Sequence, residues 1–365
     1  MSDSILSIYA RAASLEQQPV PCAVRARAPL RLGLAGGGTD LAPYCDEYGG
    51  AVLNVTIDRY AHAYVQPATG GLHLRAADLD VSETIENPAL LDAAQLKLHR
   101  AVHQRFMQDL FGGQSVDLSV TTSVDSPPGS GLGSSSALVV ALVEAYRKYF
   151  GVPLGPYEVA RLAFVIERED LAMAGGRQDQ YAATFGGLNF IEFLADGRTI
   201  VNPLRVSRAI AAELEVSLVI CFSGQSRESS NIIESQQRGM RSADPAALQA
   251  MHDLKGDAIG MKSALLSGRI DEMATILNRS RAAKNRTALG IETALINTLQ
   301  EIGLAAGAHA CKVSGAGGGG FIMFLVPPEQ SHSLIKVLEA NGAQASAVKF
   351  TQTGAESWRS MAGSL

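Results

Sequence analysis

The sequence predicts an α+β protein, and two observations carry this prediction. Segments in which apolar residues alternate, as in half-buried strands, are mixed with longer segments of helical period, and the two kinds do not alternate strictly as they do in βαβ units. Glycine-rich turns interrupt the pattern at 34–40, 126–137 and 314–320, where strands meet other elements.

The length of 365 residues indicates about two domains. A turn at Asn202-Pro203 ends the last strand pair of the first half, and a new strand begins at Leu214. We therefore place a boundary near 205–212, and we assign 1–208 to an N-terminal domain and 209–365 to a C-terminal domain.

In the N-terminal half, residues 1–20 are expected to form an irregular or helical lead-in. Apolar alternation predicts the strands that follow, and apolar residues at helical spacing predict the helices. The predicted strands span 24–34, 51–57, 60–66, 72–74, 116–124, 188–193 and 200–203. The predicted helices span 41–48, 90–111, 136–150 and 157–173.

The C-terminal half begins with a strand over 214–223 and ends with a strand over 345–351. Between them, strands over 310–313 and 320–326 flank the third glycine turn. The same periodicities predict helices over 230–238, 246–267, 270–280, 289–306 and 332–341.

The second glycine turn is the most informative stretch of the chain. It reads Ser126-Pro-Pro-Gly-Ser-Gly-Leu-Gly-Ser-Ser-Ser-Ala137 and opens directly into a helix-forming run. The start of a helix carries unpaired N–H groups and partial positive charge, and it is a natural seat for a phosphate. The glycines allow a close approach of the backbone to an anion, and the serines add hydroxyl groups for phosphate oxygens or Mg²⁺.

This turn is not a Walker motif, because no Lys-Ser/Thr pair follows its last glycine. It also departs from the dinucleotide-binding fingerprint, since Pro127-Pro128 separates the strand from the first glycine. The alternative, a flexible linker, conflicts with its position between an alternating strand and a strong helix.

Composition excludes several other classes of partner. The net charge of −5 gives no electrostatic reason to expect nucleic acid or an acidic membrane. The four cysteines form no C-x-x-C pair and are expected to be reduced thiols of a cytoplasmic protein, without a structural zinc site. We see no signal peptide and no apolar run of the roughly 20 residues that span a bilayer.

The three glycine motifs, in this order, resemble those of the GHMP kinase superfamily. They read Ala28-Pro-Leu-Arg-Leu-Gly-Leu-Ala-Gly-Gly-Gly-Thr-Asp40, then the second turn above, then Lys312-Val-Ser-Gly-Ala-Gly-Gly-Gly-Gly-Phe321. The resemblance covers about 22–351. It implies an N-terminal domain like the second domain of ribosomal protein S5, a ferredoxin-like C-terminal domain, and ATP and substrate in the cleft between them.

Finer strings resemble the D-glycero-D-manno-heptose 7-phosphate kinases within this superfamily. They lie at 34–41, 48–54, 166–171, 175–187 and 223–230. One departure is that 278–285 contains no Trp, which that group often carries there. The resemblance implies ATP and Mg²⁺ as cofactors, and an ATP loop formed by Pro128, Gly129, Ser130, Gly131, Leu132, Gly133, Ser134, Ser135 and Ser136.

The resemblance also assigns catalytic and metal-binding residues. Asp179 matches the carboxylate that faces the acceptor hydroxyl and can accept its proton, although an Asp in such a turn can also be a helix cap. Glu167, twelve positions earlier, matches the Mg²⁺-binding Glu, with Ser135 as the second ligand. The alternative is that Glu167 belongs to the solvated face of its helix, as we expect for Glu169 and Asp170.

Arg31 and Asp40, nine positions apart, match the acceptor side of galactokinase-type enzymes. Arg31 would offset charge on the transferring phosphoryl group; the alternative is an ion pair, for example with Asp179. Asp40 would bind sugar hydroxyls, or Thr39 and Asp40 would cap the helix over 41–48.

The remaining substrate-binding expectations are Gly38, Thr39, Gly176, Arg177, Arg227, Lys284 and Gly317. Arg227 and Lys284 are the candidates for a distal phosphate of the substrate, and ordinary surface cations are the alternative. His99 and His103 have helical i, i+4 spacing but no evident third ligand, so we expect them on the helix surface rather than at a metal.

The sequence therefore predicts an ATP-dependent kinase of a small sugar phosphate, with a homodimer left open. The resemblance implies phosphorylation of the anomeric hydroxyl of heptose 7-phosphate to the 1,7-bisphosphate, in GDP-heptose synthesis for a bacterial surface polysaccharide. Two alternatives remain. One is a kinase of a free sugar such as fucose, galactose or mannose, and the other is a sugar-binding regulator without catalytic activity.

Overall fold

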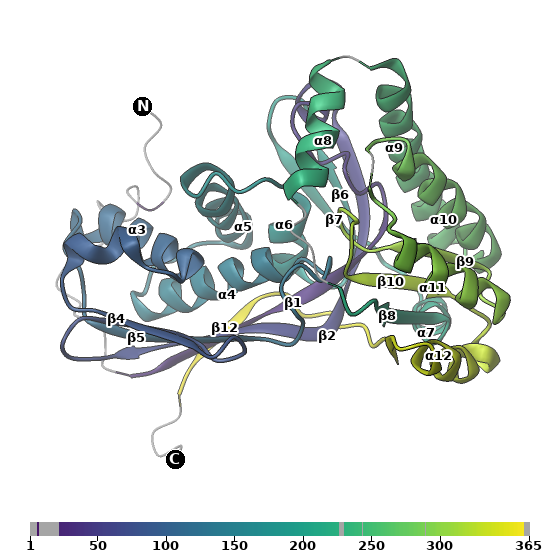
Figure 1. Ribbon diagram of the computed structural model, residues 1–365. Helices are drawn as coiled ribbons and strands as arrows, with labels where there is room; N and C mark the ends of the chain where they lie inside the picture. The colour runs from purple at the N-terminus through teal and green to yellow at the C-terminus, as the bar shows by residue number, and fades with distance from the viewer. Residues whose placement is uncertain (1–5, 7–21, 226–229, 243, 289, 361–365) are drawn as a thin grey trace.

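The computed structural model describes residues 6, 22–225, 230–242, 244–288 and 290–360. Within these ranges the chain forms one sheet of eight strands and a second sheet of four, each with packed helices (Figure 1). The strands and helices do not alternate regularly, which confirms the predicted α+β class.

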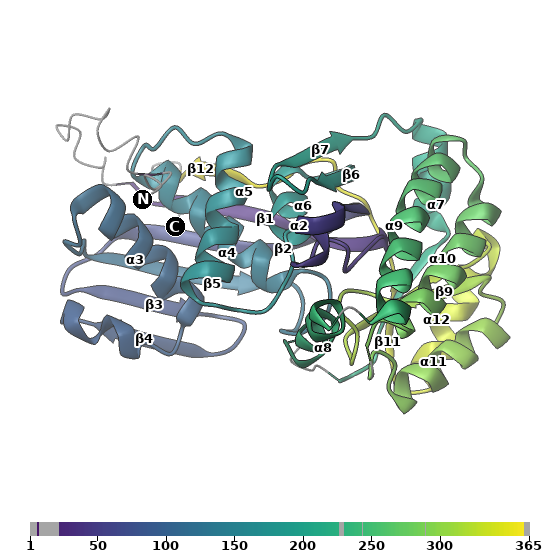
Figure 2. The same ribbon diagram turned by 90° about the horizontal axis from the view of Figure 1, so that it is seen from above.

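A long antiparallel ribbon is the spine of the first sheet. It consists of β1 (Val24–Ala35) and β2 (Gly50–Pro67). The start of β2 pairs with β6 (Leu188–Phe193), and its end pairs with β5 (Leu118–Val124). Figure 2 shows this ribbon running from the region of α3 toward α9, so it links the two halves of the molecule.

Four further strands complete the first sheet at its edges. β3 (Leu72–Ala76) runs parallel to β5, and β4 (Val81–Ile85) pairs with β3. On another branch, β7 (Thr199–Pro203) pairs with β6. A short C-terminal strand, β12 (Glu356–Arg359), pairs with β1.

Helices cover one face of this sheet (Figure 2). They are α3 (Lys97–Phe111), α4 (Ser134–Tyr149), α5 (Pro156–Phe164) and α6 (Gln178–Phe185), and a short α2 (Tyr44–Tyr48) follows β1. Helix α4 packs on both β1 and β2 and is buried along most of its length. A helix that is apolar nearly all round is stable only inside a core, and its first turn is therefore held rigidly.

The second sheet has the strand order β11-β8-β10-β9 and is antiparallel throughout. Its strands are β8 (Leu218–Phe222), β9 (Ala310–Val313), β10 (Phe321–Leu325) and β11 (Gln344–Ala347). Numbered within this sheet, the order is 4-1-3-2, with helices between the first and second and between the third and fourth strands. This is the connectivity of a ferredoxin-like fold, as the resemblance implied.

Alternation along β8 determines which helices pack on each face of the second sheet. Leu218 and Ile220 join the large core together with α9 (Pro245–Leu266) and α10 (Ile270–Asn285). The other face belongs to α11 (Ala294–Ala305) and α12 (Ser331–Ala340), and Val219 and Cys221 point into it. The remaining helices are α7 (Arg208–Val216) and α8 (Ser230–Arg241).

Two predicted helices are each divided into two segments of different helix type. The predicted helix over 90–111 is a 3₁₀ segment, Pro88–Ala93, followed by α3. The carboxylate of Glu83 accepts the N–H groups of Gln95 and Leu96 at 2.9 and 2.8 Å, which holds the intervening backbone outside a helix. The predicted helix over 157–173 is α5 followed by a π-helical turn, Val165–Asp170.

Strand β12 was not predicted from the sequence. The whole range 209–365 was assigned to the C-terminal domain, yet β12 lies in the first sheet, where Glu356 forms an ion pair with Arg27 at 2.6 Å. Its four residues, Glu-Ser-Trp-Arg, carry no apolar alternation, and they are held by the backbone pairing that the edge of β1 offers. The boundary near 208 itself stays a prediction.

The predicted lead-in over 1–20 lies, apart from residue 6, outside the described residues. Among the described helices, none has the length and apolar character needed to cross a bilayer.

Candidate active site

A cavity of about 760 Å³ lies where the two halves of the molecule meet, and it brings most of the predicted site together. Its walls come from the end of β1, the second glycine turn, the π-helical turn, the start of α6, helices α8 and α10, and the third glycine turn. The predicted residues that line it are Arg31, Gly38, Asp40, Pro128, Gly129, Gly131, Gly133, Ser134, Ser135, Ser136, Glu167, Gly176, Asp179, Lys284 and Gly317.

The first turn of α4 opens into this cavity. The N-cap of the helix is Gly133, in the left-handed conformation, and no side chain caps it. Both Ser134 and Ser135 line the cavity just beyond it. The N–H groups at this helix start therefore have no side-chain acceptor from a cap and are available to an anion, as the sequence predicted.

The third glycine turn packs against the second one and is hydrogen-bonded to it. Ser314 donates its hydroxyl hydrogen bond to the carbonyl oxygen of Gly131 at 2.9 Å, and the N–H of Phe321 donates to the carbonyl of Ser130 at 2.8 Å. A β-carbon at Gly131 would overlap the carbonyl of Ser314, and its φ of +79° also favours glycine. The glycines of both motifs are therefore needed for this close contact between two loops.

Two members of the predicted ATP loop do not line the cavity. Ser130 and Leu132 are buried, and their carbonyl oxygens accept from Phe321 and from the N–H of Arg31. These two residues anchor the loop to the second sheet and to β1.

Glu167 is fully buried and lies beside the start of α4. Its carboxylate accepts hydrogen bonds from the hydroxyls of Ser135 and Ser136 and from the amide of Gln180, each at 2.7 Å. This position excludes the solvated-face alternative for Glu167. The cluster of a carboxylate and a cavity-lining hydroxyl is a hard oxygen donor set of the kind that Mg²⁺ prefers, so the residues fit such an ion.

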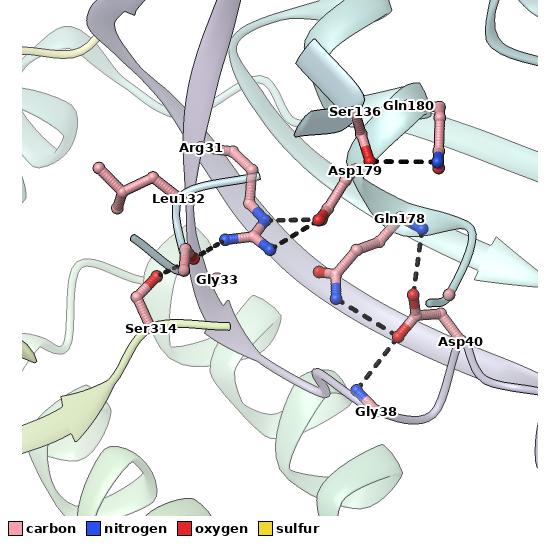
Figure 3. A network of polar contacts seen from close by, with 12 residues as sticks. Arg31, Gly33, Gly38, Asp40, Leu132, Ser136, Gln178, Asp179, Gln180 and Ser314 are labelled. Carbon is pink, nitrogen blue, oxygen red and sulfur yellow. Dashed lines mark hydrogen bonds and ion pairs between the residues drawn. The ribbon is translucent and has the colours of Figure 1, made fainter. Parts of the chain in front are cut away.

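Arg31 and Asp179 form a two-point ion pair at the centre of the site (Figure 3). The Nε and Nη2 atoms of Arg31 donate to Asp179 Oδ1 and Oδ2 at 2.8 and 3.0 Å. The third nitrogen, Nη1, donates to the carbonyl of Gly131 at 2.6 Å, so the guanidinium also touches the phosphate loop. The ion pair foreseen as an alternative exists, and it fixes the carboxylate next to Gly133.

Asp40 lies on the other side of Asp179, between the first glycine turn and the start of α6 (Figure 3). Its carboxylate accepts from the N–H of Gly38 at 3.1 Å and from both the backbone and the side chain of Gln178, at 3.1 and 3.3 Å. The capping alternative is wrong, because α2 starts only at Tyr44 and no side chain caps it. Asp40 instead satisfies the first N–H of α6.

Thr39 does not line the cavity. Its hydroxyl lies 2.8 and 2.9 Å from the carbonyl oxygens of Gly36 and Ala51, which share its single hydrogen, and it accepts from the N–H of Ala51 at 3.0 Å. With all three interactions made inside the protein, this side chain ties the first glycine turn to β2 and has no hydroxyl hydrogen left for a ligand.

Lys284 is a buried cation that lines the cavity. It projects from α10, and its Nζ donates to the carbonyl of Gly37 at 3.0 Å. Burial lowers its pKa to about 8, and Asp40 partly opposes this shift. The surface-cation alternative is therefore wrong for Lys284. Nearby Lys312 is also buried, its pKa lowered to about 7 by burial and by the charges of Lys284 and Arg31.

One predicted cation, Arg177, lies outside the site, and a second lies outside the described residues. Arg177 forms an ion pair with Asp46 at 2.8 Å and lies over the ring of Phe164, outside the cavity wall. Arg227 lies outside the described residues.

The expectation that His99 and His103 are surface residues is wrong. Both are buried, and burial lowers the pKa of each to about 4, so they are neutral near pH 7. The Nε2 atom of His99 is 2.7 Å from the hydroxyl of Thr122 at the cavity wall. His103 lies between the hydroxyls of Tyr146 and Ser115, at 3.1 and 3.2 Å. These hydroxyls are distant in sequence, so spacing on the helix could not reveal the packing.

Sequence reasoning missed several polar residues of the cavity. Arg168 was not given a role, and neither were Gln178 or Gln236, although all three line the cavity. A further glutamine, Gln180, reaches Glu167 from α6. Gln178 and Gln180 could have been predicted as site residues from the sequence, because they lie on either side of Asp179. The π-helical turn that brings Arg168 to the cavity beside Glu167 has no signal in the periodicity.

Comparisons with known proteins match both halves of the chain to one family. The family description "GHMP kinases N terminal domain" matches residues 97–187, and "GHMP kinases C terminal" matches 261–344. A D-glycero-alpha-D-manno-heptose 7-phosphate kinase from Campylobacter jejuni is 41% identical over 338 residues, which cover 92% of this chain and 99% of that protein. An L-fucokinase/L-fucose-1-P guanylyltransferase from Bacteroides fragilis is 24% identical over 86% of this chain and 36% of its own length.

Solved structures give the same fold. A D-glycero-D-manno-heptose 1-phosphate kinase from Bacteroides thetaiotaomicron superposes with a TM-score of 0.78 at 37% identity, covering 93% of this chain and all of that one. A Lactococcus lactis galactokinase shares the fold at 16% identity, with a TM-score of 0.71 and 97% and 98% coverage. The predicted family and two-domain fold are confirmed, and the chain belongs to the GHMP kinases.

Proposed function

We propose that this ATP-dependent sugar kinase transfers a phosphoryl group to the anomeric hydroxyl of D-glycero-D-manno-heptose 7-phosphate, giving the 1,7-bisphosphate. One observation carries the reaction: a single cavity joins an uncapped helix start to a fixed Arg31–Asp179 pair. The choice of sugar is supported by the 41% identity to a heptose 7-phosphate kinase along nearly its whole length.

The nucleotide would occupy the end of the cavity built by the second glycine turn. The N–H groups at the start of α4 would bind the phosphates, and apolar side chains from 76–79 and 96–98 form the wall beyond them. Ser135 and Glu167 would hold Mg²⁺, which when bound neutralises negative charge on the triphosphate.

The acceptor would enter between Asp40, Asp179 and Lys284. The acceptor oxygen attacks the γ-phosphorus, the bond from that phosphorus to the β,γ-bridging oxygen breaks, and ADP leaves. Asp179 takes the hydroxyl proton, and Arg31 offsets charge on the transferring group through its fixed guanidinium. Arg31 would fix the position of the nucleotide subsite relative to the acceptor subsite, because its guanidinium contacts Gly131 in one and Asp179 in the other.

A buried ammonium group at the acceptor end supports a phosphorylated substrate. Lys284 is enclosed by protein, and its charge interacts favourably with that of Asp40. A phosphate bound there gains a charge-assisted hydrogen bond, which is worth about 1.5–3 kcal/mol. We propose Lys284, with Arg227 as a second cation, as the contacts of the distal phosphate.

In the cell, this reaction would supply the bisphosphate from which a GDP-activated heptose for a bacterial surface polysaccharide is made. We propose the cytoplasm as the site of this step, because ATP and nucleotide sugars are made there.

The test compares substrates that differ in one group. Heptose 7-phosphate, free heptose, the heptose 1-phosphate and free fucose, galactose and mannose are each offered with ATP and Mg²⁺, and kcat/KM is measured from ADP release. We expect at least a tenfold preference for heptose 7-phosphate over free heptose, and product phosphorylated at the anomeric carbon by ³¹P NMR.

A matched pair of variants assigns the preference to a residue. Lys284→Met should remove this preference. Lys255→Met should leave it intact, because Lys255 is a half-buried lysine that donates to the carbonyl of Tyr48 outside the cavity. Equal turnover of free and phosphorylated sugars would favour the free-sugar kinase instead. Sugar binding without turnover of any sugar would indicate a regulator, which has no use for Glu167 and Asp179 together.

A further inference from the structure

The side chain of Arg168 contacts groups on both sides of the cavity, which an arginine on a solvated helix face would not do. Its side chain is only 12% exposed and lies in the cavity wall. On the phosphate side, Nη1 lies 3.4 Å from Glu167 Oε1 and Nη2 donates to the hydroxyl of Ser136 at 3.3 Å. On the acceptor side, its nitrogens donate to three backbone carbonyls, those of Met173, Ala174 and Gly176, at 3.5, 3.3 and 3.3 Å.

Two consecutive side chains of the π-helical turn reach the cavity. The turn spans Val165–Asp170, and both Glu167 and Arg168 line the cavity. The charge run Glu-Arg-Glu-Asp is thus divided between the site and the outside, where Asp170 forms a two-point ion pair with Arg105.

The segment 173–176 wraps closely around the guanidinium group. A β-carbon at Gly175 would overlap the guanidinium of Arg168, and one at Gly176 would overlap the carboxylate of Asp40. Gly175 is not in the left-handed region, so the close approach is what excludes a side chain there. The same segment therefore rests on Arg168 on one side and on Asp40 on the other, three residues before Asp179.

We propose that Arg168 is a positioning residue for phosphoryl transfer: it fixes segment 173–176 over the acceptor subsite and ties that subsite to Glu167 and Ser136. The guanidinium can do this because its donors are held in one plane and reach carboxylate, hydroxyl and carbonyls at once. Its charge also balances Glu167, which has no other cation within ion-pair distance among the described residues. The inference rests on the kinase reaction but not on the identity of the sugar.

The first test separates acceptor binding from nucleotide binding. In Arg168→Gln and Arg168→Lys, we expect the KM for the best acceptor to rise at least tenfold, while the Kd for ATP measured by calorimetry changes less than threefold. A displacement of about 1 Å in a reacting group can cost up to about 100-fold in rate. Lysine keeps the charge but has three donors on a single nitrogen, so it cannot reach Glu167, Ser136 and the three carbonyls at once and should not restore the KM.

The matched control is Arg105→Gln, which removes an arginine from the other side of the same π-helical turn without touching the cavity. Hydrogen exchange followed by mass spectrometry then reports on 171–177 directly. We expect faster exchange there in both Arg168 variants and no change in Arg105→Gln. Equal changes in acceptor KM and ATP Kd, or unchanged exchange at 171–177, would overturn the proposal.

A double-mutant cycle tests the contact itself. Gly175→Ala should lower kcat/KM for the acceptor at least tenfold, because its methyl group displaces Arg168. In the Arg168→Ala background the clash is gone, and adding Gly175→Ala should cost less than twofold. Additive effects would show that segment 173–176 does not depend on Arg168 and would refute the proposal. If Arg168→Ala does not fold, the same cycle with Arg168→Gln decides.

Discussion

Asp179→Asn is the sharpest test of the reaction chemistry, because the side chain is both the proposed base and half of an ion pair. The carboxylate is 20% exposed, whereas the Arg31 side chain is only 5% exposed. Breaking a buried ion pair from one side costs about 3–5 kcal/mol of stability. Asparagine keeps one acceptor for Arg31, and Asp179 is partly solvated, so we expect a loss of about 1–3 kcal/mol in the free energy of unfolding.

The effect on rate should be larger than the effect on folding. Loss of a general base lowers kcat by about 10²–10⁴, which corresponds to about 3–5 kcal/mol of transition-state stabilisation. Urea unfolding gives the stability, calorimetry gives the ATP affinity, and ADP release gives kcat at a temperature where the variant is fully folded. ATP affinity should be unchanged within a few-fold, since the carboxylate does not contact the helix start of α4 by hydrogen bonds.

Asp170→Asn is the control for this experiment. Asp170 also forms a two-point ion pair, with Arg105, but it lines a separate cavity on the outer side of the π-helical turn. It should lose a similar or smaller amount of stability while keeping kcat. If the folded Asp179→Asn enzyme keeps kcat within a few-fold of the parent, Asp179 is not the base and the pair with Arg31 is structural.

Four further outcomes follow from the site. Glu167→Gln should raise the Mg²⁺ concentration for half-maximal rate, because an amide is a poorer ligand for a hard cation; an unchanged metal titration would exclude Glu167 as a ligand. Since the pKa of Lys284 is about 8, its charge is lost as the pH rises through that value, so kcat/KM for the phosphorylated acceptor should fall there but not in Lys284→Arg. The unfolded chain still binds that proton, so the free energy of unfolding should rise between about pH 8 and pH 10 relative to Lys284→Met; a flat difference would refute the lowered pKa. Gly131→Ala should raise the KM for ATP at least tenfold through its clash with Ser314, and an unchanged KM would mean that the loop contact does not position the nucleotide.

The sequence by itself determined the fold class, the family, and most of the site, because these depend on local signals. Glycine-rich turns next to apolar strands and helices indicate where the backbone must bend or approach an anion, and this pattern is readable without contacts. Arg31, Asp40, Glu167 and Asp179 could be named because the resemblance to the GHMP kinases assigns a role to each of these positions.

Tertiary structure alone decided what those side chains touch. The third glycine motif was recognisable, but only packing reveals that it supports the second one through Ser314 and Phe321. Thr39 and Arg177 lie in the right motifs, yet their polar groups are used by β2 and Asp46. Strand β12 could not be predicted, because it has no apolar alternation and is held by backbone pairing to β1, which leaves no signal in the sequence. Arg168 enters the site through a π-helical turn and a loop that closes on it, and such long-range geometry is set by the whole fold rather than by any local pattern.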